Sequence, residues 1–198
     1  MRALSEAGFG PDPITLRAAV PGDAEAIAGI YGPIVTRTTI SFEEVAPSTA
    51  EMAKRIASIT RTYPWLVAVV DGKIVGYAYA GPHGERAGYR WSADVSVYLA
   101  AEARGLGIGR RLYERLFALV RLLGLRRLYA GVKIPNPASE SLHRAMGFVP
   151  VGTYRRVGFK LGRWHDVRWF ELVLRDDDDP PSEPLKWPSI ADSVEDTT

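Results

Sequence analysis

The sequence predicts a mixed α/β domain with a sheet flanked by helices, on three observations. Strand-like segments alternate with amphipathic helices between residues 14 and 175. Asp71-Gly72 joins two apolar runs, which is a strong signal for a β-hairpin. A glycine-rich run, Arg104 to Gly109, stands between a half-buried strand and a long amphipathic helix. We find no internal repeat, so we expect one domain.

Two helices and one strand are predicted before the hairpin. Residues 14–20 form the strand, and residues 21–35 form a helix with Asp23 placed to cap it. After an extended piece, a second helix begins near Pro47 and Ser48. The hairpin itself covers residues 65–81.

The strand at residues 91–99 alternates strictly between apolar and polar side chains, so we expect it to be half-buried. The apolar face carries Trp91, Ala93, Val95, Val97 and Leu99, and the polar face carries Ser92, Asp94, Ser96 and Tyr98.

Four further elements follow the glycine-rich run. A helix with apolar residues at helical spacing ends at Gly124, and a strand covers residues 126–133. Asn136 caps a short helix that Gly147 closes, and residues 154–174 form a final pair of strands.

Composition excludes several kinds of chemistry. The 198 residues are 46% hydrophobic and 24% charged, as in ordinary globular proteins. Without cysteine there is no disulfide, thiolate metal site or cysteine nucleophile, and the three histidines lack ligand spacing, so we expect no metal. Because no apolar run approaches the roughly 18 residues of a membrane span, and no signal peptide is evident, we expect a cytoplasmic protein.

Charge is distributed unevenly along the chain. Residues 176–198 hold eight carboxylates and one lysine, a net of −7, which leaves +9 for the rest because the total is +2. A basic domain suits an anionic ligand, but no dense basic arm predicts nucleic acid binding. We expect residues 176–198 to form a disordered acidic tail and residues 1–13 a flexible extension.

The glycine-rich run is predicted to hold a phosphate group through backbone N–H groups at a helix N-terminus. The spacing of Gly105, Gly107 and Gly109 does not fit a dinucleotide fingerprint, and the next strand ends in Lys133 rather than an acid. Arginines after Gly109 exclude a P-loop. An R-x-x-G-x-G pattern remains, with a plain tight turn as the alternative.

This pattern resembles the acetyl-CoA core of the GNAT N-acetyltransferase superfamily. The blocks VYLAAEARGLGIG, LYAGV and Asn136 to Phe148 carry the resemblance. Within it, YPWLVA, GYAYAGP, RAGYRW, IPNPASESLHRAMGF and GRWHDVRWF are similar to phosphinothricin N-acetyltransferases. The resemblance covers residues 14–174.

The resemblance implies a fold, a co-substrate and a reaction. The expected fold is a GNAT domain over residues 14–175, with a mostly antiparallel sheet whose central strands splay to admit acetyl-CoA. An amine would attack the thioester directly in a ternary complex. The implied acetyl-CoA-binding residues are Val97, Tyr98, Leu99, Arg104, Gly105, Leu106, Gly107, Ile108, Gly109, Arg110, Asn136 and Ser139.

Asp94 and His143 are the catalytic residues that the resemblance implies. The family has Glu at the position of Asp94, and the shorter Asp predicts proton removal through water. His143 is expected to protonate the CoA thiolate, although imidazole can also act as the base, so the division of labour stays open. We expect His165 to support a strand.

For the acceptor, the resemblance implies a small amino-acid-like amine such as phosphinothricin, methionine sulfoximine or methionine sulfone. The implied substrate-binding residues are Phe42, Arg86, Tyr89 and Lys133. His83, Gly84 and Lys133 depart from the Trp, Lys and Gly of the family. Three alternatives stay open: a peptide N-terminus, a polyamine, or an acyl-CoA sensor without catalysis. The family also implies a homodimer.

Overall fold

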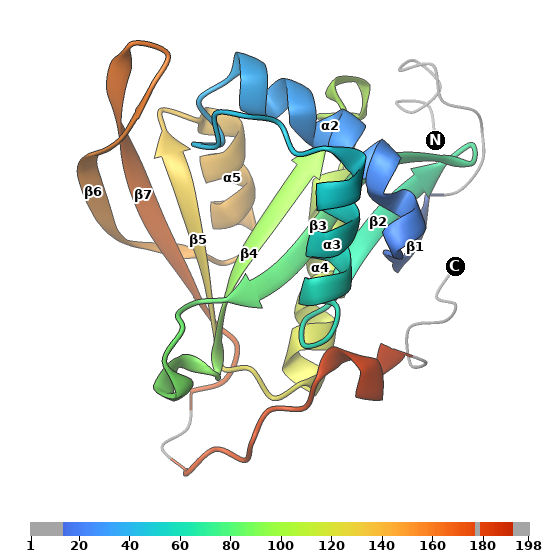
Figure 1. Cartoon of the computed structure of the whole chain (residues 1–198). Coiled ribbons are helices and arrows are strands. Elements are labelled where there is room, and N and C mark those ends of the chain that lie inside the picture. Colours follow the sequence, from blue (N-terminus) through green and yellow to red (C-terminus); the bar gives the residue numbers. More distant parts are fainter. Residues whose placement is uncertain (1–13, 177–178, 192–198) are drawn as a thin grey trace.

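A seven-stranded sheet forms the centre of the protein in a computed structural model that describes residues 14–176 and 179–191 (Figure 1). Its order is β1-β2-β3-β4-β5-β7-β6. The strands are β1 (Thr15–Ala18), β2 (Trp65–Val70), β3 (Lys73–Pro82), β4 (Ser92–Leu99), β5 (Arg127–Ile134), β6 (Val149–Lys160) and β7 (Arg163–Val173). The helices are α2 (Ala24–Arg37), α3 (Thr49–Ile59), α4 (Ile108–Leu122) and α5 (Pro137–Ala145). Short 3-10 turns are η1 (Pro21–Asp23), η2 (Ala87–Tyr89), η3 (Ala101–Ala103) and η4 (Trp187–Ser189).

The two central strands, β4 and β5, separate after a short ladder. β4 and β5 run parallel, whereas the other neighbouring strands pair antiparallel. The ladder between β4 and β5 consists of three residue pairs and ends at Asp94 opposite Tyr129. Figure 1 shows the strands diverging beyond this point. This confirms the predicted mixed, mostly antiparallel sheet with splayed central strands.

Helices cover both faces of the sheet with separate hydrophobic clusters. α2 and α3 pack Ile27 and Ile56 against Trp65 and Tyr77 on one face. On the other face, the apolar stripe of α4 packs against β2 to β5. The sheet is therefore the middle layer of three, and the gap between β4 and β5 passes through it.

Most local signals in the sequence correspond to the observed elements. The Ser48 hydroxyl caps α3 by accepting from the Glu51 N–H at 3.2 Å. Asp71 and Gly72 take positive φ angles of 50° and 72° in the β2–β3 turn. Asp23 differs, because its carboxylate makes no cap bond to α2 and instead accepts from Arg17 at 2.7 Å.

β6 begins at Val149, earlier than the predicted start at residue 154. Its pairing with β7 shifts register between Pro150 and Gly152 and again between Tyr154 and Gly158. These irregularities interrupt the period-two pattern on which the prediction relied. Exposed apolar residues along this edge strand are Val149, Val151, Tyr154, Val157 and Phe159.

The expected disordered tail does not hold for residues 179–191. Trp187 is only 4% exposed, and its N–H donates to the Thr62 carbonyl at 3.0 Å. The N–H of Leu185 donates to the Leu123 carbonyl at 2.9 Å. A single buried aromatic side chain thus orders a segment whose composition is polar and acidic. The expectations for residues 1–13, 177–178 and 192–198 lie outside the described residues.

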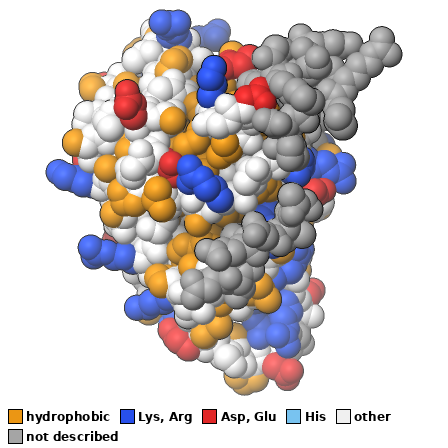
Figure 2. All heavy atoms as spheres, turned by 90° about the vertical axis from the view of Figure 1, so that its right-hand side faces the viewer, with side chains coloured by type: hydrophobic (Ala, Val, Ile, Leu, Met, Phe, Trp, Pro, Cys, Tyr) orange, Lys and Arg blue, Asp and Glu red, His pale blue; other side chains and the backbone are white. Residues whose placement is uncertain are grey.

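Figure 2 shows one side of the surface, where Lys and Arg side chains are interspersed with hydrophobic and other side chains. Within the described parts of the chain, each helix is too short or too polar to cross a lipid bilayer.

Candidate functional site

Two connected cavities lie where β4 and β5 separate. The smaller, which we call the central gap, has a volume of about 60 Å³ and lies between the strands. The larger, which we call the donor groove, has a volume of about 420 Å³ and extends to the start of α4. Residues that line both are Ile40, Val97, Tyr98, Asn136 and Ser139. The cavities therefore form one path from the surface into the sheet.

The glycine-rich run forms one wall of the donor groove. Gly105 and Gly107 have φ angles of 75° and 79°, which L side chains rarely adopt. A Cβ atom at either position would project into open space, so the backbone is bare on that side. Gly107 is the N-cap of α4, whose first N–H groups lack acceptors within the helix. This arrangement can bind an anion through backbone donors.

The structure brings together ten of the twelve residues predicted to bind acetyl-CoA, and all ten line the donor groove. Leu106 and Ile108 lie elsewhere: Ile108 is fully buried in the core, and Leu106 packs against that core. Leu106 precedes the N-cap of α4 and Ile108 is its first residue, so these two side chains pack against the core behind the loop. The ring of Tyr98 packs against Tyr31 and Tyr77, at 5.1 and 5.3 Å between centroids.

His143 lies in α5 at the inner end of the central gap and is 3% exposed. Its Nδ1 lies 2.8 Å from the Ser139 carbonyl oxygen, which can only accept, so Nδ1 carries a proton. Its Nε2 lies 3.2 Å from the Tyr113 hydroxyl. Burial lowers the pKa of His143, and the bond to Ser139 acts against this shift. A neutral imidazole whose Nε2 accepts from Tyr113 follows.

Asp94 lies at the vertex of the gap and is hydrogen-bonded to His83. One carboxylate oxygen, Oδ1, is 2.7 Å from Nδ1 of His83. Burial raises the pKa of Asp94, and the bond to His83 acts in the opposite direction. The His83 ring stacks on Tyr129, with centroids 4.2 Å apart and an interplanar angle of 22°. The predicted base therefore has an imidazole partner that the sequence analysis did not assign.

The four predicted acceptor residues do not lie at one place. Lys133 lines the central gap. Tyr89 in η2 stands beside the His83 ring, 5.9 Å away, while Arg86 is exposed at the start of η2. Phe42 instead packs over Gly158 of β6, where an added Cβ would come within 2.4 Å of its ring.

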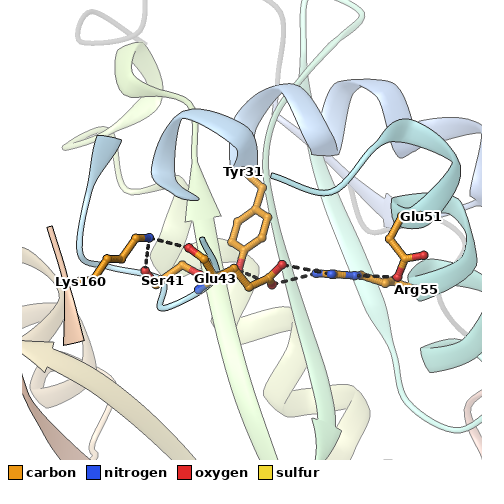
Figure 3. A network of polar contacts seen from close by, with 6 residues as sticks. All are labelled: Tyr31, Ser41, Glu43, Glu51, Arg55 and Lys160. Atoms are coloured by element: carbon orange, nitrogen blue, oxygen red, sulfur yellow. Dashed lines mark hydrogen bonds and ion pairs between the residues drawn. The ribbon is translucent and has the colours of Figure 1, made fainter. Parts of the chain in front are cut away.

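A partly buried polar network holds the loop between α2 and α3, whose Ile40 lines the gap (Figure 3). Arg55 pairs with both carboxylate oxygens of Glu43, and the Tyr31 hydroxyl donates to the same carboxylate at 2.8 Å. Burial acts to raise the pKa of Glu43, but the bonds from Arg55 and Tyr31 outweigh it and lower this pKa. Lys160, 7% exposed, donates through Nζ to three backbone carbonyls. These belong to Val35, Ser41 and Glu43, at 2.6, 2.6 and 2.7 Å.

The sequence analysis missed three residues of this site: His83, Tyr113 and Lys160. His83 carried one usable signal, its departure from the family pattern, but its bond to Asp94 depends on the register between β3 and β4. Tyr113 and Lys160 act through long-range contacts that sequence spacing does not reveal. No group of three or more potential metal-ligating side chains occurs in the ranges that the structure describes.

Comparison with known proteins places this architecture in a family. Residues 16–169 match the model of the acetyltransferase (GNAT) domain. A phosphinothricin N-acetyltransferase from Alcaligenes faecalis is 44% identical over 155 residues, which are 77% of this chain and 79% of the relative. An L-methionine sulfoximine/L-methionine sulfone acetyltransferase from Salmonella typhimurium is 33% identical over 162 residues, 81% of this chain and 95% of the relative.

A solved structure agrees with the fold as a whole. The GNAT superfamily phosphinothricin acetyltransferase from Sinorhizobium meliloti, crystallised in complex with AcCoA, superposes with a TM-score of 0.82 at 40% identity. The match covers 86% of this chain and 94% of that protein.

Proposed function

This chain belongs to the GNAT family of acetyl-CoA-dependent N-acetyltransferases, and we propose that it acetylates the amine of a small amino-acid-like acceptor. Phosphinothricin, methionine sulfoximine and methionine sulfone are the leading acceptors, since relatives over most of the chain are named for them. The observation that carries the proposal is the continuity of the donor groove with the central gap.

The donor groove fits acetyl-CoA by its chemistry. Bare backbone at Gly105 and Gly107 and the N-terminus of α4 supply donors for the pyrophosphate. The stretch of β4 beyond Asp94 has left its ladder with β5 but stays paired with β3, so its backbone groups that face β5 are available to pair with the amide-bearing pantetheine arm. The acetyl thioester would then reach the central gap, where an N–H of β4 polarises its carbonyl.

The acceptor amine attacks the thioester carbon directly, without an acyl-enzyme. The C–N bond forms, the C–S bond breaks, and the electron pair leaves on the CoA sulfur. The amine gives up its proton at the Asp94 carboxylate or at the imidazole bonded to it. Asp94 stands at the vertex of the gap, one residue before its lining begins at Val95, and His83 is bonded to it.

His143 is our candidate for protonating the departing thiolate. In the neutral ring Ser139 holds Nδ1–H and Nε2 carries no proton, so His143 would first take up a proton from solvent on Nε2, on the side that it shares with Tyr113. That proton would pass from Nε2 to the CoA sulfur as the C–S bond breaks, and burial, which favours the neutral ring, assists its release.

The acceptor carboxylate needs a cation. Lys133 lines the gap and Arg86 is exposed at the start of η2, the turn that holds Tyr89 beside His83, so we propose each of these two cations as a candidate to bind the carboxylate. The protein would act as a homodimer through β6, because this long edge strand exposes the apolar side chains named above. Sedimentation with Val157→Lys, a charge on that face, tests the dimer.

An acetyl-CoA-dependent thiol-release assay tests the proposed function. We expect turnover with phosphinothricin, methionine sulfoximine or methionine sulfone, and little with polyamines or peptides. Preference for a polyamine or a peptide N-terminus would replace the acceptor class. Acetyl-CoA binding in calorimetry without turnover of any amine would instead support an acyl-CoA sensor.

A further inference from the structure

The His83 side chain is held among aromatic rings but is only partly buried. Its ring stacks on Tyr129 and meets the edges of Tyr89 and Trp169, at 5.9 and 6.2 Å between centroids. Its side chain keeps 27% of its surface exposed. The ring is therefore fixed in orientation by aromatic neighbours while part of it remains accessible.

The hydrogen bond to Asp94 defines which ring nitrogen is free. An ionised carboxylate can only accept, so Nδ1 of His83 carries the proton of the 2.7 Å bond. In the neutral ring, Nε2 then has a lone pair. No side chain or carbonyl among the described residues bonds to this Nε2. A carboxylate that accepts from Nδ1–H in this way fixes the tautomer of the imidazole and leaves Nε2 as the nitrogen that can accept a proton.

The pair lies at the point where the sheet opens. Asp94 and Tyr129 are the last paired residues of β4 and β5, and the next residues, Val95 and Ala130, already line the central gap. His83 stands over this last pair, because it stacks on Tyr129 and bonds to Asp94. The imidazole therefore lies beside the closed end of the central gap, next to the first residues that line it.

We propose that His83 is the general base of this enzyme and that Asp94 is the residue that positions it. The proposal rests on the proposed function and refines its proton transfer. Nε2 of His83 takes a proton from the acceptor amine as the C–N bond forms and the CoA thiolate departs. The Nδ1–H···Oδ1 bond stabilises the resulting imidazolium, which returns the proton to solvent after product release.

The groups around His83 are few and shape its pH response. Asp94 faces it from β4, Tyr129 from β5, and Tyr89 from η2. Behind Tyr129, the carboxylate of Glu171 in β7 accepts from the Tyr129 hydroxyl at 2.9 Å. Asp94 is the group in direct hydrogen-bond contact, so it dominates the stabilisation of a charged ring.

Kinetics of matched variants separate the two roles. We expect His83→Gln to lower kcat/KM for the acceptor by roughly 10²- to 10⁴-fold and to remove the acidic limb of the pH profile between about pH 5 and 8. Asp94→Asn, which can still accept from Nδ1–H, should keep a limb, moved to lower pH, with a smaller loss. Glu85→Gln, an exposed carboxylate nearby, is the charge control and should match the wild type.

The opposite pattern overturns the proposal. If His83→Gln keeps its activity and the acidic limb of its pH profile while Asp94→Asn loses both the activity and the limb, Asp94 is the base and His83 is only its hydrogen-bond partner. Added imidazole should restore turnover to His83→Ala in proportion to its concentration, which a merely structural role would not allow. Unchanged acetyl-CoA affinity in calorimetry shows that a variant is folded. If His83→Gln or Asp94→Asn fails this control, the imidazole rescue of His83→Ala decides whether His83 is the base.

A measurement without substrate keeps this test separate from the proposed function. Nitrogen-15 spectra of the wild-type protein at alkaline pH should show His83 protonated on Nδ1, and Asp94→Ala should lose this preference. An Nε2–H tautomer in the wild type overturns the proposal even if acetyl transfer is established. A wild type that acetylates no amine would instead refute the proposed function and with it the base assignment.

Discussion

The two sides of the central gap differ in the atoms that form them: main chain on the donor side and side chains on the other side. The donor side uses main chain: β4 beyond Asp94, the glycine-rich run, and the start of α4, all within residues 95–110. The other side uses side chains from separate elements, with His83 after β3, Asp94 on β4 and Lys133 on β5. A site made of backbone within one short segment depends on local spacing. A site made of converging side chains depends on the whole sheet.

A negative charge in the glycine-rich run should affect the donor side most. Gly107 has a φ of 79°, which Asn and Asp tolerate better than other residues, so Gly107→Asp and Gly107→Asn form a matched pair. Two unit charges about 5 Å apart repel by ~3 kcal/mol at an effective dielectric constant of ~20, which is about 100-fold in affinity. Calorimetry should show acetyl-CoA binding about 100-fold weaker in the Asp variant than in the Asn variant. Equal acetyl-CoA affinities of the two variants would show that the pyrophosphate does not bind at this loop.

Loss of the Lys160 ammonium should show that the loop over the gap depends on tertiary contacts. Lys160→Met leaves three backbone carbonyls without their donor, and unsatisfied buried groups cost about 1 kcal/mol or more each. Because the Met side chain recovers some apolar burial, we expect urea denaturation to show a loss of about 2 kcal/mol. Lys54→Met, at an exposed position of α3, is the control and should change stability by less than ~0.5 kcal/mol. Equal effects would mean that the network contributes nothing.

Removal of the Arg86 guanidinium should weaken binding on the acceptor side and leave binding on the donor side unchanged. Arg86→Ala should raise the acceptor KM about tenfold and leave acetyl-CoA affinity unchanged, since a charge-assisted hydrogen bond contributes roughly 1.5 kcal/mol or more. Steady-state kinetics with the acceptor varied, together with acetyl-CoA calorimetry, measure both quantities. A parallel loss in both would show that Arg86 supports the fold of η2 instead.

The smallest effect concerns His143 and the pH dependence of stability. Because burial depresses its folded pKa below the unfolded value of about 6.5, the unfolded chain binds the proton first. Its contribution to stability is complete above about pH 6.5 and decreases as the pH falls towards the folded pKa. His143→Gln should flatten the decline in unfolding free energy below pH 6.5 by at most about 1.4 kcal/mol per pH unit. Identical slopes for both proteins would contradict a neutral buried imidazole.

Sequence reasoning succeeded where structure follows from neighbours along the chain. The hairpin at Asp71-Gly72 and the start of a helix near Ser48 depend on adjacent residues, and both were predicted. Ten of the residues predicted to bind acetyl-CoA line one cavity, and their role in binding stays a prediction. Phe42 was expected at the acceptor pocket but packs on Gly158, since its position depends on a loop fixed by Lys160 more than 100 residues later. His83 was seen only as a departure, because its bond to Asp94 requires the β3–β4 register.

The central gap is lined from both layers of helices. Ser96 belongs to the α2–α3 side through its contacts with Tyr79 and Tyr98, whereas Tyr113 and His143 reach it from α4 and α5. The gap is therefore lined from both faces of the sheet. If the donor reaches it through the donor groove and the acceptor from the other face, as we propose, a CoA analogue lacking sulfur should compete with acetyl-CoA and not with the acceptor.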